Sequence, residues 1–294
     1  MKPLCKLCLN SDDLKDSHVL PRFLGKYLKN TSATGYLMAI DTEGRPSRSQ
    51  DLYKMKLLCS GCELILNEAE TFFANTIFYP FQHGTLGTIP VDERLSRFAV
   101  SVSLRAVWIM QLAQHALIEK WKTELEELEF EWRSYLLNSP DFVKGQNSHH
   151  IILCDENFIA VGVRNSPNLI HSIMRSSAYY LFEKFDKAYV FANLAGVQVI
   201  SMISPVELPV SQGTQVYPEQ TFGVVTPPGI GWGGYYQNLL ALAREFAAAS
   251  SRLSKAQRER VDRVMNTERA AKSEDIRILK KQQQLRRNVP PETE

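Results

Sequence analysis

The chain has no long hydrophobic run, which bears on whether it could cross a membrane. Its most apolar stretch, residues 98–113, is shorter than the ~20 residues that a transmembrane helix needs, and Arg105 lies in its middle. We therefore expect no membrane partner. The first residues lead to Cys5 without an apolar segment, so a signal peptide is not expected either. Both features favour a cytoplasmic protein.

The chain also has little net charge, +2 over 294 residues, so its overall charge indicates no class of partner. The charge is unevenly distributed, however. Residues 252–287 contain twelve Lys or Arg and five Asp or Glu, a local net charge of +7. Such a segment could neutralise phosphates, which makes DNA a candidate partner. A solvated helix that pairs with an acidic protein, or an arm for self-association, would carry the same charges.

Cysteine is scarce, and its pattern is not that of a disulfide-rich secreted domain. Four of the five cysteines form two CxxC pairs, Cys5 with Cys8 and Cys59 with Cys62. Two such pairs can supply the four thiolates of a structural Zn²⁺ site. A redox disulfide pair and an iron–sulfur cluster are the alternatives, and the flanking residues favour neither. Cys154, inside an apolar segment, is predicted to be a small buried side chain.

The spacing of apolar residues predicts a mixed fold. We expect a loop or hairpin over residues 30–51, a helix after Cys62, and one long or two consecutive helices from an N-cap at Asp92 to about Leu137. A strand or hairpin is predicted over 151–163, a helix over 168–185, and one or two strands over 188–203. Residues 205–234 are expected to form a long loop, and residues 236–287 are compatible with a helix.

These elements predict an α+β protein in three parts. Residues 1–78 would form a small zinc-stapled module, and residues 91–250 a larger, mainly helical α+β domain of unknown role. Residues 251–294 would form a charged, net basic C-terminal helix and tail.

The order of motifs in the first quarter of the chain resembles the HNH endonuclease family. A CxxC pair is followed by the run Ser17-His18-Val19-Leu20-Pro21 and then by Leu57-Leu58 before the second CxxC pair. The resemblance implies a ββα-metal, treble-clef-like module in which zinc holds a hairpin and a helix together. It also implies that His18 is the general base that activates water against a phosphodiester.

The chemistry of DNA hydrolysis fits the residues around this motif. An imidazole can take a proton from water near neutral pH, and a Lewis acid must stabilise the charge on the phosphate. Mg²⁺ and Mn²⁺ take oxygen ligands. Glu63, Asn67 and Glu70 are spaced i, i+4 and i+7, so they share one face of the predicted helix. Glu70 and Asn67 are the predicted ligands of the catalytic cation, with Glu63 as an alternative ligand.

Three positions differ from the usual HNH pattern. Ser17 stands where an acidic residue usually precedes the histidine, Glu63 stands where an asparagine usually follows the second CxxC pair, and residues 53–56 replace a central asparagine. These changes fit a divergent active nuclease. They also fit a non-catalytic zinc protein that recognises nucleic acid or scaffolds a partner complex.

Residues 91–294 resemble no family, and their role is predicted from architecture alone. A nuclease-like module joined to a larger body is common among bacterial effectors that act against phage and plasmids, so we expect a role in antiviral defence. The C-terminal domain is where a protein partner or a second copy of the chain would bind.

Overall fold

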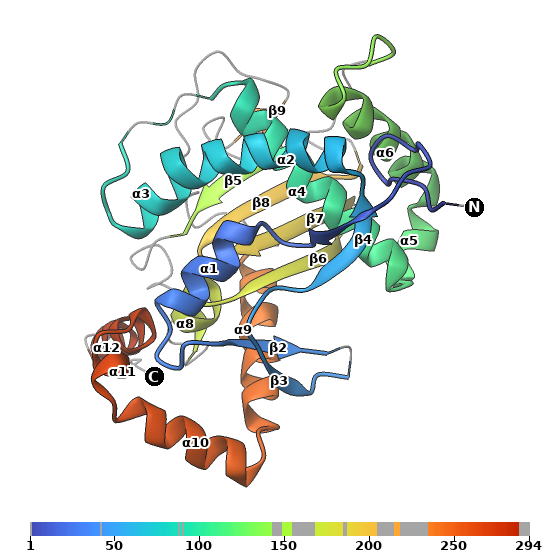
Figure 1. Ribbon diagram of the computed structural model, residues 1–294. Coiled ribbons are helices and arrows are strands. Elements are labelled where there is room, and N and C mark those ends of the chain that lie inside the picture. Colours follow the sequence, from blue (N-terminus) through green and yellow to red (C-terminus); the bar gives the residue numbers. More distant parts are fainter. Residues whose placement is uncertain are drawn as a thin grey trace.

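The structure, a computed structural model, combines helices and strands, as the sequence predicts, and its sheets are antiparallel. The described residues are 2–41, 43–87, 89, 91–142, 149–154, 168–184, 187–204, 215–217 and 235–287. Figure 1 shows a large sheet with helices on both of its faces and the cysteine-bearing N-terminal segment beside it.

The N-terminal segment is organised around a short two-stranded sheet. Strand β1 (Lys15–His18) pairs antiparallel with β4 (Lys54–Leu58), which places His18 opposite Lys54. The chain between these strands forms α1 (Arg22–Asn30) and a hairpin of β2 (Leu37–Ile40) and β3 (Pro46–Ser49). The hairpin predicted over residues 30–51 is confirmed.

Helix α2 (Ser60–Phe73) begins directly after β4 and connects the N-terminal segment to the body of the protein. It continues through one π-helical turn, η1 (Ala74–Phe78), into the short helix α3 (Tyr79–Gln82). The ring of Phe73 stacks on that of Phe98, with 3.6 Å between ring centroids. The apolar core of the N-terminal segment is therefore continuous with the core of the body.

The central helix is α4 (Glu93–Leu112). Its N-cap is Asp92, whose Oδ1 accepts a hydrogen bond from the backbone N–H of Leu95 at 3.1 Å, as the sequence predicts. Every residue from Phe98 to Trp108 is buried, because α4 packs between α2 and the large sheet. Two further helices follow, α5 (Ala116–Lys120) and α6 (Lys122–Leu136), which confirms a helical region up to about Leu137.

The large sheet is antiparallel, and its five strands lie in the order β6-β7-β8-β5-β9. The strands are β5 (His149–Leu153), β6 (Ser177–Lys184), β7 (Lys187–Leu194), β8 (Val197–Met202) and β9 (Gln215–Tyr217). Strands β7 and β8 are joined by Ala195 and Gly196, both at positive φ, which is the conformation that a tight two-residue hairpin requires. A Cβ at Gly196 would also lie 2.6 Å from Sδ of Met174.

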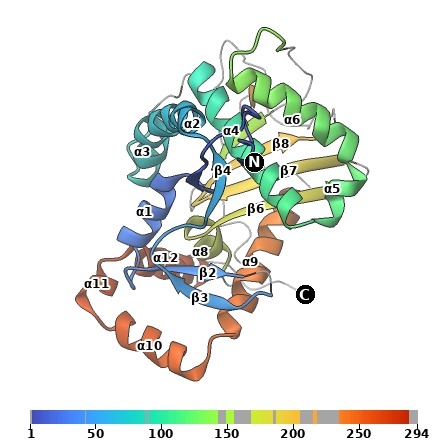
Figure 2. The ribbon, with the colours of Figure 1, turned by 45° about the vertical axis from the view of Figure 1, so that its right-hand side comes forward.

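The two faces of this sheet form two separate apolar cores, because side chains alternate along each strand. Ile151 faces α4, whereas Ile152 faces the core formed with α8 (Leu169–Met174) and the C-terminal helices. Those helices are α9 (Tyr235–Ser251), α10 (Lys255–Met265), α11 (Glu268–Ala271) and α12 (Glu274–Arg287). Figure 2 shows α10 joining α9 to α11 below the hairpin of β2 and β3.

The structure corrects two of the predicted elements and confirms others. The helix predicted over 168–185 ends at Met174, and residues 177–184 form strand β6 instead. The region 236–287 is four helices rather than one. The strands predicted over 188–203 are β7 and β8, and Cys154 is buried. Most of the loop predicted over 205–234 lies outside the described residues.

None of the helices in the described part of the chain combines the length and apolar character needed to cross a lipid bilayer.

Candidate active site and metal centre

The four cysteines of the two CxxC pairs form one cluster. Cys5 and Cys8 lie on a tight turn that ends at Leu9, whose φ is +59°. Cys59 is the N-cap of α2, and Cys62 lies in the first turn of the same helix. All four Sγ atoms lie within 4.8 Å of one another, and those of Cys8 and Cys59 are 3.9 Å apart.

This arrangement of sulfur atoms suits a metal ion with tetrahedral coordination. Zinc–sulfur bonds of ~2.3 Å place ligand sulfurs about 3.8 Å apart in a tetrahedron. The cysteines form no disulfide in the structure. Burial, reinforced by the neighbouring thiols, raises the pKa of Cys62. A bound cation would favour the thiolate instead. The cluster could therefore bind a metal such as zinc.

The cluster also fixes the position of β4 and α2 relative to the N-terminal turn. The backbone N–H of Lys6 donates to the carbonyl of Leu57 at 2.9 Å, and the N–H of Cys59 donates to Sγ of Cys5 at 3.3 Å. Since β4 also pairs with β1, the cysteines hold the strand that carries His18 beside the helix that begins at Ser60.

His18 is held by a carboxylate that the sequence analysis did not identify. Its Nε2 lies 3.1 Å from Oδ1 and 3.2 Å from Oδ2 of Asp51, and this carboxylate also binds Lys54 at 2.6 Å and accepts from the N–H of Leu52 at 2.9 Å. Burial would raise the pKa of Asp51, but the hydrogen bonds from Lys54 and His18 outweigh it and lower the pKa to about 2. Asp51 is therefore an anion at neutral pH, and the imidazole side chain remains partly exposed, at 16%.

The backbone around His18 is held from the body of the protein. Nη1 of Arg105, on α4, donates to the carbonyl of His18 at 3.3 Å, and the Tyr179 hydroxyl on β6 donates to the carbonyl of Val19 at 2.9 Å. Arg105 is almost fully buried, and its Nη2 donates to Oε1 of Glu70 at 2.5 Å. This ion pair offsets the cost of burying the guanidinium.

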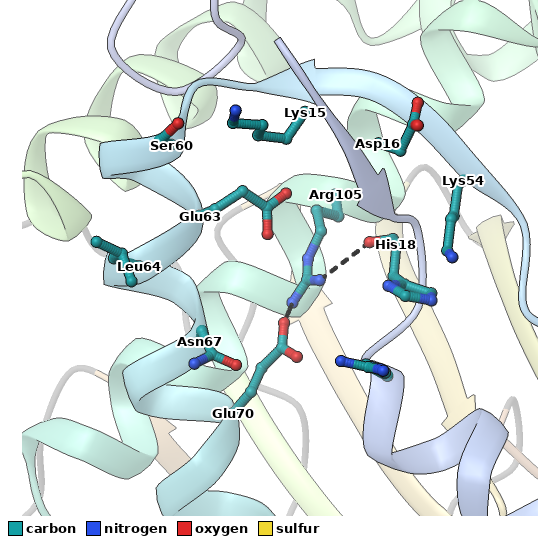
Figure 3. A pocket seen from close by; sticks show the side chains of 11 residues that line it. Lys15, Asp16, His18, Lys54, Ser60, Glu63, Leu64, Asn67, Glu70 and Arg105 are labelled. Atoms are coloured by element: carbon teal, nitrogen blue, oxygen red, sulfur yellow. Dashed lines mark hydrogen bonds and ion pairs between the residues drawn. The ribbon is translucent and has the colours of Figure 1, made fainter.

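Glu63, Asn67 and Glu70 lie on one face of α2, as their spacing predicts, and this face is turned toward His18 (Figure 3). One carboxylate oxygen of Glu70 accepts a hydrogen bond from Arg105. Oε1 of Glu63 is buried and makes no hydrogen bond within the described part of the chain. An acceptor in that state costs free energy unless a ligand or cation contacts it.

These side chains line a single open cavity of about 580 Å³. The structure thus brings all four sequence-predicted catalytic residues, His18, Glu63, Asn67 and Glu70, to one place. The residues that line the cavity are Lys15, Asp16, His18, Arg22, Lys54, Ser60, Glu63, Leu64, Asn67, Glu70 and Arg105.

Two residues beside His18 were missed by sequence reasoning. For Arg105 a signal existed, since a lone cation inside the apolar run 98–113 must find a partner if that helix is buried. For Asp51 there was none, because it follows a polar hairpin and meets His18 only through the fold.

Comparison of the chain with family models, with curated proteins and with solved structures gives no match.

Proposed function

We propose that this protein is a metal-dependent DNA endonuclease of the HNH type. The observation that carries the proposal is the cavity in which His18 faces Glu63, Asn67 and Glu70 directly beside the four-cysteine cluster. In this proposal β1, β4 and α2 are the two strands and the helix of a zinc-bound ββα-metal module. Structural zinc would be held by Cys5, Cys8, Cys59 and Cys62.

His18 would act as the general base. With Nε2–H donating to the Asp51 carboxylate, Nδ1 carries the lone pair that accepts a proton from water. The deprotonated water oxygen then attacks phosphorus, the P–O bond to the leaving group breaks, and the leaving oxygen takes up a proton from solvent. Asp51 fixes the ring orientation and stabilises the imidazolium that forms, which is the general function of a carboxylate on a basic histidine.

The face of α2 fits a hard divalent cation. Glu63 and Asn67 offer oxygen ligands, the buried Oε1 of Glu63 accepts no hydrogen bond from the described residues, and Glu70 keeps its second oxygen beside Arg105. Bound Mg²⁺ or Mn²⁺ would supply Lewis-acid stabilisation of charge on the phosphate. The residues that would hold it are Glu63, Asn67 and Glu70.

A non-catalytic zinc protein that recognises nucleic acid or scaffolds a partner complex is the second candidate function. It is favoured by one observation: Glu70 is paired with Arg105, and His18 with Asp51. Such pairs could serve the fold alone. In that case His18 would contribute to stability and not to cleavage.

A role in bacterial defence against phage or plasmids, in the cytoplasm, is proposed from architecture. The module is joined to a larger body whose C-terminal helices contact it. Oδ2 of Asp275, in α12, accepts a hydrogen bond from the N–H of Ala33 at 2.8 Å, and Arg175 donates to the Thr31 hydroxyl at 2.9 Å. The same body would provide the surface for a protein partner or a second copy.

Plasmid cleavage tests the proposal directly. The zinc-loaded full chain is incubated with supercoiled DNA and Mg²⁺ or Mn²⁺, alongside His18→Ala and the control His83→Ala, which alters a histidine outside the cavity. We expect wild type and His83→Ala to nick the plasmid and His18→Ala to be slower by about 10²-fold or more. Cleavage that is equal in wild type and His18→Ala, or absent in both, would favour the non-catalytic function.

A further inference from the structure

Most of the charged side chains that line the cavity form ion pairs, either with each other or with residues just outside the lining. Lys54 is bound to Asp51 at 2.6 Å, Arg105 to Glu70 at 2.5 Å, and Asp16 to Lys56 at 3.1 Å. Three charged lining residues have no such partner in the described part of the chain: Glu63, Lys15 and Arg22. Glu63 is already assigned to the cation, which leaves two free positive charges.

These two cations lie on either side of His18 along the chain. Lys15 begins β1, His18 ends it, and Arg22 is the first residue of α1. At about 3.3 Å per residue, Lys15 is roughly 10 Å from His18 along the strand. Figure 3 shows Lys15 near Ser60 at one end of the cavity, and the Arg105 side chain between Glu63 and His18. Both cations are exposed.

We propose that Lys15 and Arg22 bind the phosphates that flank the scissile phosphate on one DNA strand, so that the strand runs along the cavity from β1 to α1. An exposed, unpaired Lys or Arg gains by neutralising a phosphate and releasing its counterions. The paired cations Lys54 and Arg105 would have to break an ion pair to do the same. This inference rests on the proposed function and adds the path of the substrate.

The test is the salt dependence of DNA binding. Binding of a labelled duplex is followed by fluorescence anisotropy from about 50 to 200 mM KCl, with the zinc-loaded full chain carrying His18→Ala to prevent cleavage. We expect Lys15→Gln and Arg22→Gln each to weaken binding and to reduce the slope of log K against log salt by about 0.9. The matched control is Lys122→Gln, which removes an exposed lysine on α6 that is paired with Glu119 at 4.0 Å; neither residue lines the cavity, so the slope should be unchanged.

The outcomes separate this inference from the proposed function. If wild type cleaves DNA but neither substitution changes the salt slope, the strand path is wrong and the nuclease proposal survives. If both slopes fall but wild type does not cleave, the binding path stands and the catalytic proposal fails. A protein that binds no duplex and no single strand contradicts both. Unchanged melting temperatures of the variants show that the substitutions act on binding and not on folding.

Discussion

His18 is held at two points, its imidazole ring and its backbone carbonyl. Nε2 faces the Asp51 carboxylate, while the backbone of the same residue is fixed by Arg105. Asp51 is itself held between His18 and Lys54. The orientation of the imidazole therefore depends on residues 33 and 87 positions away in the sequence, and each can be removed separately.

Asp51→Ala should lower the rate of DNA cleavage by about 10–100-fold without weakening DNA binding, because it frees the imidazole, leaves Lys54 unpaired and removes no phosphate contact. Single-turnover cleavage and binding measurements separate these two effects. Asp16→Ala is the control, since it removes a carboxylate from the same cavity that pairs with Lys56 and not with His18. Equal losses in the two variants would show that Asp51 does not act through His18.

Residues linked by a metal-binding motif or by helical spacing could be predicted, and those that only the fold brings together could not. The CxxC spacing identified the four clustered cysteines, and helical periodicity placed Glu63, Asn67 and Glu70 on one face. The partner of His18 lies on the far side of a hairpin whose length and direction no local pattern determines. The pairing of Glu70 with Arg105 likewise requires α2 and α4 to pack together.

At the scale of elements, β1, β4 and α2 depend on one another through the cysteine cluster. The two strands pair over only four residues of β1, a length that gives little stability in water. Metal ligation by residues from the N-terminal turn and from the start of α2 would supply the missing stability.

Cys59→Ser should abolish stoichiometric zinc binding and lower the melting temperature, because three thiolates remain and the helix loses its ligating N-cap. Zinc content by elemental analysis and thermal unfolding measure both effects. Cys154→Ala is the matched control: Cys154 is fully buried but outside the cluster, so this variant should keep its zinc. Equal zinc content in both variants would contradict a site at the four cysteines.

The elements that the sequence misassigned show how tertiary pairing and side-chain caps decide local structure. The spacing of apolar residues predicts a helix over residues 168–185, which includes residues 177–184. Pairing with β7 makes them a strand, with Tyr179 and Leu181 buried at alternate positions. In the C-terminal region, Ser254 and Thr267 accept hydrogen bonds as N-caps and so begin new helices.

At the scale of the whole molecule, the protein keeps several histidines buried and neutral. Burial lowers the pKa of His150, on β5, to about 4. In the unfolded chain a histidine has a pKa of about 6.5. Between these values the unfolded state binds a proton that the folded state does not, so the free energy of unfolding falls as pH decreases from about 6.5 toward 4.

His150→Gln should therefore make stability less dependent on pH. Urea unfolding at a series of pH values between about 6.5 and 5 should show a slope that is smaller by up to about 1.4 kcal/mol per pH unit than in wild type. The slope is the relevant measurement, because the substitution itself changes the packing of a buried residue. A variant with the wild-type slope would show that the pKa of His150 is the same in the folded and unfolded states.

The whole molecule also explains why the site cannot be understood from the N-terminal segment alone. Arg105 and Tyr179 reach it from α4 and β6, and the C-terminal helices hold the end of α1 and the hairpin that leads to Asp51. Residues of the body thus fix the position of His18 through these hydrogen bonds. We therefore expect cleavage to require the full chain.

The central claim, that His18 is the base in this cavity, is tested most directly by chemical rescue. The cleavage rate of zinc-loaded His18→Ala is measured with and without free imidazole in the buffer. The proposal predicts a large loss of rate that imidazole partly restores in proportion to its concentration, since the small base replaces the missing ring. A variant that cleaves DNA as fast as wild type without imidazole would contradict it.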